Sequence, residues 1–176
     1  AALRIVDAAN EWIYSRLDRD NTIWIQTSDN GGDPTQGASN YPLRGGKVSG
    51  WQGGFQVPCF VWLGANLRGS LKEYEGLVYV TDWVPTIIGG ALGAPEVLPD
   101  HLYGQDLWES LRGNSEKARE DILRMASYGT GDEAGEAMVS LRTDRYKVTI
   151  GQAPCAVGTP AGGADGLRRF RSVAGL

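Results

Sequence analysis

Two oxygen-bearing side chains, Asp29 and Asn30, lie just beyond residues 22–27, whose β-branched and aromatic residues predict a β-strand. Open α/β sheets bind ligands at the carboxyl ends of their strands, so this pair stands where a binding site is expected. A carboxylate and a carboxamide are hard oxygen donors, which suit Ca²⁺ or Mg²⁺ better than Zn²⁺. The alternative is a simple Asx turn, because Asp-Asn-Gly-Gly is also good turn chemistry. Two side chains supply only part of the about six to eight oxygens that calcium takes.

A lysine, Lys47, lies in a glycine-rich stretch, since residues 31–54 contain eight glycines. Such a stretch predicts a long loop, and long loops inside compact domains are usually functional. A lysine in this setting can reach into a cleft and hold an anionic oxygen as a compact point charge. The phosphate-loop pattern G-x-x-x-x-G-K followed by Ser or Thr is absent. The alternative for Lys47, and equally for Arg44, is a solvated loop side chain.

The composition excludes several other chemistries. The single histidine, His101, leaves little material for a histidine-rich zinc site or a Ser-His-Asp triad, and we interpret it as a surface loop residue. Two cysteines, Cys59 and Cys155, are too few for a disulfide scaffold, and the sequence leaves open whether they pair. A net charge of −4 over 176 residues offers no general attraction to nucleic acid. No apolar run approaches the length of a membrane span.

The elements that would position these residues alternate between helix and strand. Apolar residues recur at steps of three and four over residues 2–17, which predicts an amphipathic helix before the first strand. Residues 57–63 are an apolar run typical of a buried strand. A helix is predicted over residues 81–92, with Asp82 as a helix cap rather than a catalytic acid. This alternation indicates an α/β fold in which strand 22–27, apolar on both sides, is a central strand of a parallel sheet.

The second half of the sequence predicts a smaller, largely extended unit. Residues 94–104 are a proline-containing connector and a boundary between domains. A short helix over 106–111 and a strand over 122–126 follow. Alternating residues on both sides of Thr143-Asp144-Arg145 predict a β-hairpin over 137–150. Residues 151–176 are rich in Gly, Ala and Pro with several arginines, which predicts a disordered basic tail.

Three segments together resemble the formylglycine-dependent (type I) sulfatase family. They are T-I-W-I-Q-T-S-D-N-G-G from Thr22, N-Y-P-L-R-G-G-K-V-S-G-W-Q-G-G from Asn40, and Y-V-T-D-W-V-P-T-I-I from Tyr79. Within that family the chain is most similar to the N-acetylgalactosamine-4-sulfatase (arylsulfatase B) group. The resemblance covers roughly residues 2–150, and the combination of segments is far more specific than any one of them.

The resemblance implies an α/β fold of the alkaline-phosphatase-like sandwich type, with residues 1–93 as the later part of the catalytic domain. Residues 94–150 would begin a small C-terminal lobe with an antiparallel sheet. The implied activity is that of a sulfuric ester hydrolase (an arylsulfatase) assisted by one Ca²⁺, with Asp29 and Asn30 matching two of the metal ligands. Lys47 matches a catalytic lysine that contacts the sulfate ester.

The departures from the family pattern carry further expectations. The family's nucleophile is a formylglycine made from the cysteine of C-x-P-x-R, and neither Cys59 nor Cys155 lies in such a pattern. Its first pair of calcium-binding aspartates is also missing, so we expect a C-terminal-half fragment that is inactive alone. The parent protein would act on a sulfated sugar or an aryl sulfate and, by the resemblance, be secreted, lysosomal or periplasmic. The alternatives are a non-catalytic module that binds Ca²⁺ or anions, a related phosphatase, and a pseudoenzyme.

Overall fold

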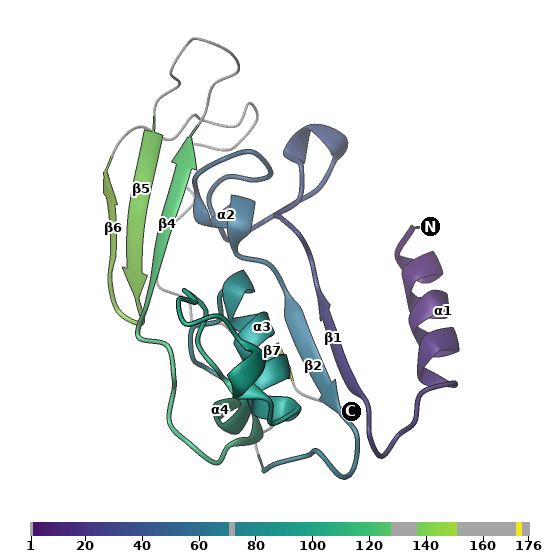
Figure 1. Cartoon of the computed structure of the whole chain (residues 1–176). Helices are drawn as coiled ribbons and strands as arrows, with labels where there is room; N and C mark the ends of the chain where they lie inside the picture. The colour runs from purple at the N-terminus through teal and green to yellow at the C-terminus, as the bar shows by residue number, and fades with distance from the viewer. Residues whose placement is uncertain (1, 71–72, 128–136, 151–171, 174–176) are drawn as a thin grey trace.

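The computed structural model describes residues 2–70, 73–127, 137–150 and 172–173. The helical elements are α1 (Ala2–Tyr14), α2 (Gln52–Phe55), α3 (Trp83–Pro85) and α4 (Trp108–Arg112), with the 3-10 turns η1 (Pro34–Gln36), η2 (Val80–Asp82) and η4 (Pro95–Val97) and the π-helical η3 (Thr86–Ala91). The strands are β1 (Ile23–Thr27), β2 (Cys59–Leu63), β3 (Glu73–Tyr74), β4 (Asp121–Ser127), β5 (Ala137–Thr143), β6 (Lys147–Ile150) and β7 (Ser172–Val173). Figure 1 shows β1 and β2 between α1 on one side and α3 and α4 on the other.

The predicted helix and strands of the first half are confirmed as α1, β1 and β2, with α1 ending at Tyr14. β1 pairs with β2 in antiparallel fashion, and Ile25 lies opposite Val61. The prediction that this strand is a central strand of a parallel sheet is therefore wrong for the described part of the chain. The long glycine-rich loop returns the chain beside β1 in the opposite direction, as antiparallel connections allow.

Helical elements contact apolar residues on both faces of this sheet. On one face, Ile23 and Val61 line a small apolar cavity together with Trp83, Ile87 and Trp108 from the helical elements. On the other face, Trp62 is buried and its ring meets that of Tyr14 in α1 edge-on, with 5.7 Å between the ring centroids. The hydrophobic core therefore lies between the sheet and the helical elements that follow residue 80.

The predicted helix over residues 81–92 is confirmed as a continuous helical run of η2, α3 and η3, although its turns are irregular. The Leu92 N–H donates to the Ile87 carbonyl at 2.9 Å, an i to i−5 bond typical of a π-helix. Gly93 follows with a φ of 65° and ends the run. Within the run, a Cβ on Gly90 would collide with Trp108, so α4 packs directly on its backbone.

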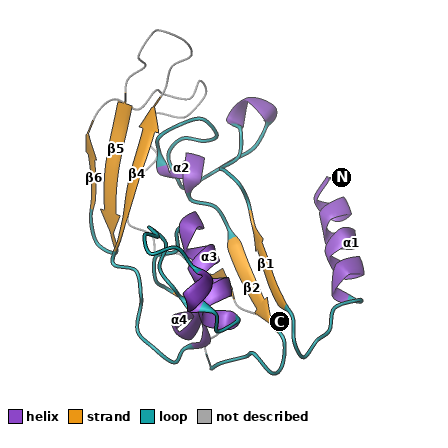
Figure 2. Cartoon of the chain, in the orientation of Figure 1, coloured by secondary structure: helices purple, strands orange, loops and turns teal. Residues whose placement is uncertain are grey.

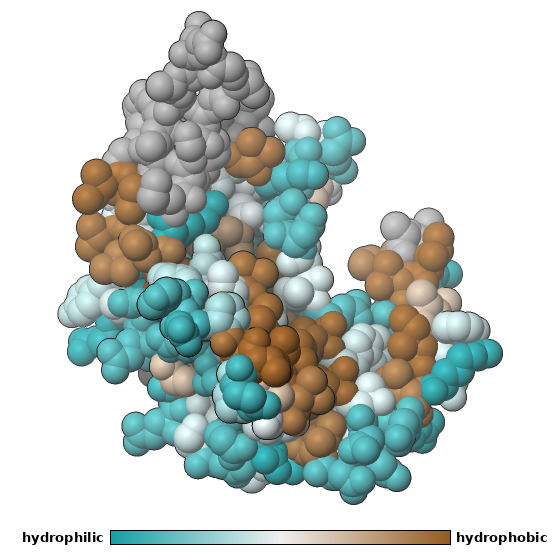
Figure 3. All heavy atoms as spheres, viewed as in Figure 1, coloured by the Kyte–Doolittle hydropathy of each residue, from teal (hydrophilic) through white to brown (hydrophobic). Residues whose placement is uncertain are grey.

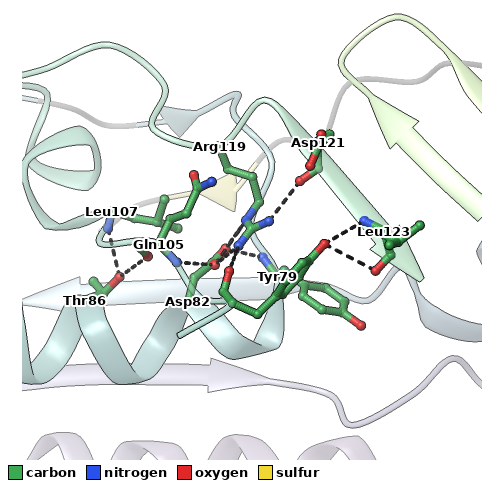
Figure 4. A network of polar contacts seen from close by, with 9 residues as sticks. Tyr79, Asp82, Thr86, Gln105, Leu107, Arg119, Asp121 and Leu123 are labelled. Atoms are coloured by element: carbon green, nitrogen blue, oxygen red, sulfur yellow. Dashed lines mark hydrogen bonds and ion pairs between the residues drawn. The ribbon is translucent and has the colours of Figure 1, made fainter. Parts of the chain in front are cut away.

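Asp82 and Arg119 form a buried ion pair that joins this helical run to the second half of the chain (Figure 4). Their side chains are 0% and 1% exposed, and Arg119 Nε donates to Asp82 Oδ2 at 2.8 Å. The Asp82 carboxylate also accepts the backbone N–H of Tyr79 at 2.7 Å and that of Gln105 at 2.9 Å. The bond from Tyr79 makes Asp82 part of a capping box at the start of η2, but its side chain makes no cap bond to α3. Its ion pair was not predicted.

The guanidinium of Arg119 also reaches the connector and the three-stranded sheet. It donates to the carbonyls of Tyr103 at 3.0 Å and Asp121 at 2.9 Å. The hydroxyl of Tyr103 in turn accepts the Leu123 N–H at 2.9 Å. Burial opposes the charged form, but the hydrogen bonds and charge of Asp82 outweigh it and raise the pKa of Arg119. Residues on both sides of 94–104 therefore share one buried polar network.

The predicted strand and hairpin of the second half are confirmed as an antiparallel sheet in the order β4-β5-β6 (Figure 2). The Thr143 N–H donates to the Tyr146 carbonyl at 2.8 Å and closes the hairpin turn. The predicted short helix is confirmed as α4, which ends at Gly113 with a φ of 80°. The predicted disordered tail, 151–176, lies outside the described residues except for β7, which pairs with β3, so for Ser172–Val173 the prediction is wrong.

Large apolar side chains of α1 are exposed to solvent. Leu3 is 79% exposed, Ile5 70% and Trp12 59%. Figure 3 shows apolar residues gathered along α1 and, separately, over the helical run next to the sheet. The amphipathic pattern that predicted α1 thus produces an apolar face on this helix. Only the end of α1 near Tyr14 packs on the sheet. In the part of the chain that the structure describes, no helix has the length and apolar character to cross a bilayer.

Candidate functional site

The predicted metal pair lies at the carboxyl end of β1, where the chain leaves the sheet and enters the glycine-rich loop. Asp29 is exposed and Asn30 is half-buried. The Asn30 N–H donates to Asp29 Oδ1 at 2.8 Å, and Asn30 Nδ2 donates to the Gly31 carbonyl at 2.9 Å. A local turn, the alternative raised by the sequence, is therefore present. It leaves Oδ2 of Asp29 and Oδ1 of Asn30 as the oxygens that these side chains can offer to a cation.

A backbone hydrogen bond brings the Lys47 segment to this turn. The Lys47 N–H donates to the Gly32 carbonyl at 3.0 Å, and the Lys47 side chain itself is exposed. Asn40 braces the same point, because its Nδ2 donates to the carbonyls of Gly32 at 2.8 Å and Gly45 at 3.2 Å. Its Oδ1 accepts the Gly32 N–H at 2.8 Å. Residues from two separate sequence motifs are thus held together by one carbonyl group.

Two glycines allow the loop segments to cross in backbone contact. The Gly31 N–H donates to the Gly54 carbonyl at 2.9 Å, and a Cβ on Gly31 would collide with the Gly53 carbonyl oxygen. A Cβ on Gly46 would lie 2.6 Å from Pro34 Cδ. Such approaches exclude any larger residue without a backbone shift. The glycines that indicated a functional loop are therefore what lets that loop close on the end of β1.

The charge of Lys47 acts on the neighbouring Asp33. Hydrogen bonds from the hydroxyl and backbone N–H of Thr35, at 2.6 and 2.9 Å, are the main reason that the pKa of Asp33 is lowered. The positive charge of Lys47 lowers that pKa further. Asp33 therefore carries a negative charge at neutral pH, and this charge partly offsets the positive charge of the nearby Lys47 ammonium group.

Arg44 does not remain a freely solvated side chain. Its guanidinium carbon lies 3.7 Å from the ring centroid of Trp51, a close cation–π contact. Its carbonyl accepts the Gly53 N–H at 2.7 Å. Of the two readings of Arg44 that the sequence left open, the structure favours neither: the side chain packs on an aromatic ring of its own loop.

The remaining candidate residues are not part of this turn. His101 is exposed in the connector, which confirms its interpretation as a surface loop residue. Cys59 is a free thiol on β2, opposite Thr27, and burial is the main reason that its pKa is raised. Cys155 lies outside the described residues. A raised pKa keeps Cys59 protonated at neutral pH, so it behaves as a half-buried packing residue rather than a nucleophile.

The donors at the end of β1 fit a hard cation in type and in position. Asp29 and Asn30 offer adjacent carboxylate and amide oxygens, the ligand chemistry that calcium prefers. Among the described residues, no three His, Cys, Asp or Glu side chains are grouped so that they could hold a metal ion. By themselves, these two side chains could supply only part of the ligand set that a calcium ion takes.

Sequence reasoning missed Asn40 and Arg119. Each is defined by its partners across the loop or across the chain, Gly32 for the first and Asp82 for the second. The one signal for Asn40 is its chemistry: an amide that carries both a donor and an acceptor, placed among glycines, suits the bracing of a loop. Arg119 has no such local signal.

Comparison with known proteins identifies the family of the chain. A family model described as Sulfatase matches residues 1–94. Arylsulfatase J of Mus musculus is 42% identical over 104 residues, which cover 58% of this chain and 17% of that protein. Steryl-sulfatase of Rattus norvegicus is 30% identical over 136 residues, which cover 69% of this chain and 23% of that protein. The chain thus spans less than a quarter of the length of either relative. Because the family model matches more than half of its residues, the chain belongs to the sulfatase family.

Proposed function

We propose that this chain supplies one side of the active site of a sulfuric ester hydrolase, on an alkaline-phosphatase-like sandwich. Asp29 and Asn30 are two ligands of a Ca²⁺ ion, and Lys47 is the catalytic residue that binds an oxygen of the sulfate ester. Residues 1–93 belong to the catalytic domain and residues 94–150 begin a smaller lobe. The substrate is a sulfated sugar or an aryl sulfate.

One observation carries this proposal: the 3.0 Å hydrogen bond from the Lys47 N–H to the Gly32 carbonyl. It places the backbone of Lys47 beside the turn that holds the two proposed oxygen ligands, although the two motifs are separate in sequence. Membership of the sulfatase family supports the assignment of a common role to these residues. Without the family, the turn and the lysine would remain two ordinary loop features.

The chemistry assigned to these residues is electrostatic. A sulfuryl group in transfer carries negative charge on its non-bridging oxygens, and fixed positive groups lower the energy of that state. A bound calcium ion would supply a Lewis acid for the same oxygens. The ammonium group of Lys47 binds and orients the ester as a point charge on a flexible stem. The nucleophile, a formylglycine in this family, is assigned to residues other than those of this chain, because C-x-P-x-R is absent from it.

Substitution of Lys47 in the full-length protein tests this role. We expect Lys47→Ala to lower kcat/KM for an aryl sulfate by about a hundredfold or more, as loss of one charge-stabilising group does in other enzymes. Lys47→Arg should restore part of the rate. Lys117→Ala is the matched control, because Lys117 is a half-exposed lysine whose partner is Asp144, and it should change kcat/KM little. Equal rates for Lys47→Ala and Lys117→Ala would contradict the proposal. Residues 1–176 alone should show no turnover.

A further inference from the structure

Lys47 lies at the tip of a tight turn whose two ends are buried. The Ser49 N–H donates to the Gly46 carbonyl at 2.9 Å, which closes a β-turn over residues 46–49. The Ser49 hydroxyl also accepts the Gly46 N–H at 3.0 Å, and Ser49 is 3% exposed. Lys47 and Val48, the two central residues of the turn, are exposed. The turn therefore presents Lys47 to solvent on a base that is fixed inside the loop.

The same turn holds Val48 in an unfavourable backbone conformation. Its φ is 70°, and β-branched residues rarely adopt this left-handed region. Glycine is the usual residue at the third position of a turn when φ is positive there. Such a conformation persists only where the surroundings determine it, and residues of this kind cluster at functional sites. Because Val48 is itself 75% exposed, contacts from elsewhere hold the turn in this form.

The half-buried side chain of Asn40 supplies such contacts at the base of the turn. Its Nδ2 donates to the Gly45 carbonyl at 3.2 Å and to the Gly32 carbonyl at 2.8 Å, and its Oδ1 accepts the Gly32 N–H at 2.8 Å. An asparagine amide has two donors and can accept two bonds, so three of its four positions are used. The Gly32 carbonyl is also the group that accepts the Lys47 N–H. One side chain therefore fixes both the entry to the turn and the partner of the Lys47 backbone.

Gly46 leaves the space in which this amide lies. A Cβ at position 46 would lie 2.9 Å from Asn40 Nδ2 and 2.7 Å from the Gly32 carbonyl oxygen. A larger residue there would therefore displace the amide or the backbone that it holds. Gly32 lies two residues beyond Asn30, at the end of the turn that carries the proposed metal ligands. Asn40 thus joins that turn to the one that carries Lys47.

The relative position of these two turns matters for the proposed chemistry. A lysine is a point charge on a flexible stem, so the place of its backbone sets the region that its ammonium group reaches. A misplacement of about 1 Å in a reacting group can lower a rate by about a hundredfold. A side chain that touches neither the ester nor the metal can therefore control the reaction through the backbone of Lys47.

We propose that Asn40 is a positioning residue for the hydrolysis of the sulfate ester. Its amide fixes the β-turn over residues 46–49 against the turn of Asp29 and Asn30, and this places the ammonium group of Lys47 at the ester oxygen. The inference rests on the role proposed above for Lys47 and adds a residue through which that role is exerted. Asn40 itself neither contacts the ester nor transfers a proton.

Steady-state kinetics of the full-length protein with an aryl sulfate, at saturating calcium, test the proposal. Asn40→Ala should lower kcat/KM by about tenfold or more, because the turn is no longer held in register. Asn66→Ala, the same change at an exposed asparagine, is the matched control and should alter kcat/KM by less than about twofold. In a Lys47→Ala background, Asn40→Ala should cost less than about threefold, since no ammonium group is left to position. A merely structural role would give the same factor in both backgrounds.

A second readout depends on neither calcium nor turnover. The positive charge of Lys47 contributes to the lowered pKa of Asp33, so this pKa reports the place of the ammonium group. Asn40→Ala changes no charge, yet it should raise the pKa of Asp33 by loosening the Lys47 turn. In a Lys47→Gln background the same substitution should leave the pKa of Asp33 unchanged. Carboxyl-carbon NMR titration of the metal-free protein measures both.

Asn40→Asp keeps the test decisive if Asn40→Ala does not fold. This variant retains the size of the side chain and the acceptor for the Gly32 N–H but loses both donors until its carboxyl group is protonated. Its kcat/KM, relative to the unchanged protein, should therefore recover as pH falls. A ratio that stays constant with pH would overturn the proposal.

The proposal is also overturned if Asn40→Ala leaves kcat/KM within about twofold of the unchanged protein, or lowers it by the same factor with and without Lys47. Its failure is distinct from failure of the proposed function. A large loss in Lys47→Ala with none in Asn40→Ala would remove only the role of Asn40. Equal rates for Lys47→Ala and Lys117→Ala would remove the proposed function, and this inference with it.

Discussion

At the scale of single residues, Asp33 connects the electrostatics of the glycine-rich loop with the position of Lys47. Its carboxylate accepts hydrogen bonds from the Thr35 hydroxyl and backbone, and its pKa also responds to the charge of Lys47. The titration of Asp33 therefore reports where the Lys47 ammonium group lies. That position is the least constrained part of the site, because the lysine is held through its backbone.

We expect Thr35→Val to raise the pKa of Asp33 toward the ordinary aspartate value, since the Thr35 hydroxyl is the largest cause of its depression. Lys47→Gln should raise it by a smaller amount. A depressed folded-state pKa means that these interactions stabilise the loop above the unfolded pKa and are lost as pH falls through the folded pKa. Carboxyl-carbon NMR titration measures both shifts. A larger shift in Lys47→Gln than in Thr35→Val would contradict this order of causes.

Single residues were predictable where their chemistry and their place in a strand–loop pattern coincided. Asp29 and Asn30 follow a strand that is confirmed as β1. Lys47 lies in a loop whose glycines indicated close backbone contacts, which the structure contains. Asn40 and Arg119 were not predictable, because each acts on partners chosen by the tertiary fold. A sequence shows a side chain's donors and acceptors but not the distant carbonyl or carboxylate that they reach.

At the scale of elements, the Asp82–Arg119 ion pair fixes the helical run against the connector and the three-stranded sheet (Figure 4). A buried ion pair costs desolvation energy, and its loss is expensive mainly because the surviving charge stays buried and unpaired. The pair is therefore better described as fixing the relative position of elements than as a large net source of stability. Its contribution is measurable by removing one partner or both.

We expect Asp82→Ala to lower the free energy of unfolding by about 3–5 kcal/mol, because Arg119 would remain buried without its carboxylate. The double variant Asp82→Leu with Arg119→Met should lose less than the sum of the single variants, since no charge is left behind. Lys117→Gln, which breaks the half-exposed pair with Asp144, should cost less than about 1 kcal/mol. Urea denaturation of these variants, of the single variants Asp82→Leu and Arg119→Met, and of the unchanged protein checks this. Additive losses in the double variant would be evidence against a coupled pair.

Elements were predicted well where hydrophobic periodicity was strong, as in α1, β1, β2 and the β5–β6 hairpin. Strand direction was not, because residues apolar on both faces indicate burial between two layers and do not specify a parallel neighbour. Here the helical run packs on one face of an antiparallel pair, and Tyr14 at the end of α1 packs on the other. The irregular turns of residues 80–91 also escaped prediction, since contacts such as Gly90 with Trp108 set them.

At the scale of the whole molecule, the described apolar surfaces that are open to solvent include α1 and the face of the three-stranded sheet that carries Leu123 and Leu141. Leu3 and Ile5 on α1 are 79% and 70% exposed, and Ile150 at the end of β6 is 70% exposed. Apolar side chains grouped in this way ordinarily lie against other protein surface. Residues 1–176 also cover less than a quarter of the length of arylsulfatase J and of steryl-sulfatase.

We expect residues 1–176, produced alone, to increase the fluorescence of the dye ANS and to self-associate as concentration rises, because both apolar surfaces are open. Leu3→Lys with Ile5→Lys should reduce both effects, since it removes apolar area from α1. The full-length protein is the reference and should bind less dye per molecule. A chain that stays monomeric and does not increase ANS fluorescence would show that these surfaces are covered in solution.

The central claim is that Asp29, Asn30 and Lys47 act on one sulfate ester. A crystal structure of the full-length protein, grown with calcium and a non-hydrolysable sulfonate analogue of its substrate, tests it most directly. We predict calcium within about 2.3–2.6 Å of Asp29 and Asn30 side-chain oxygens, and a sulfonate oxygen within about 3 Å of Lys47 Nζ. Calcium bound elsewhere, or a sulfonate that Lys47 does not touch, would contradict the account and leave this turn as a structural feature of the loop.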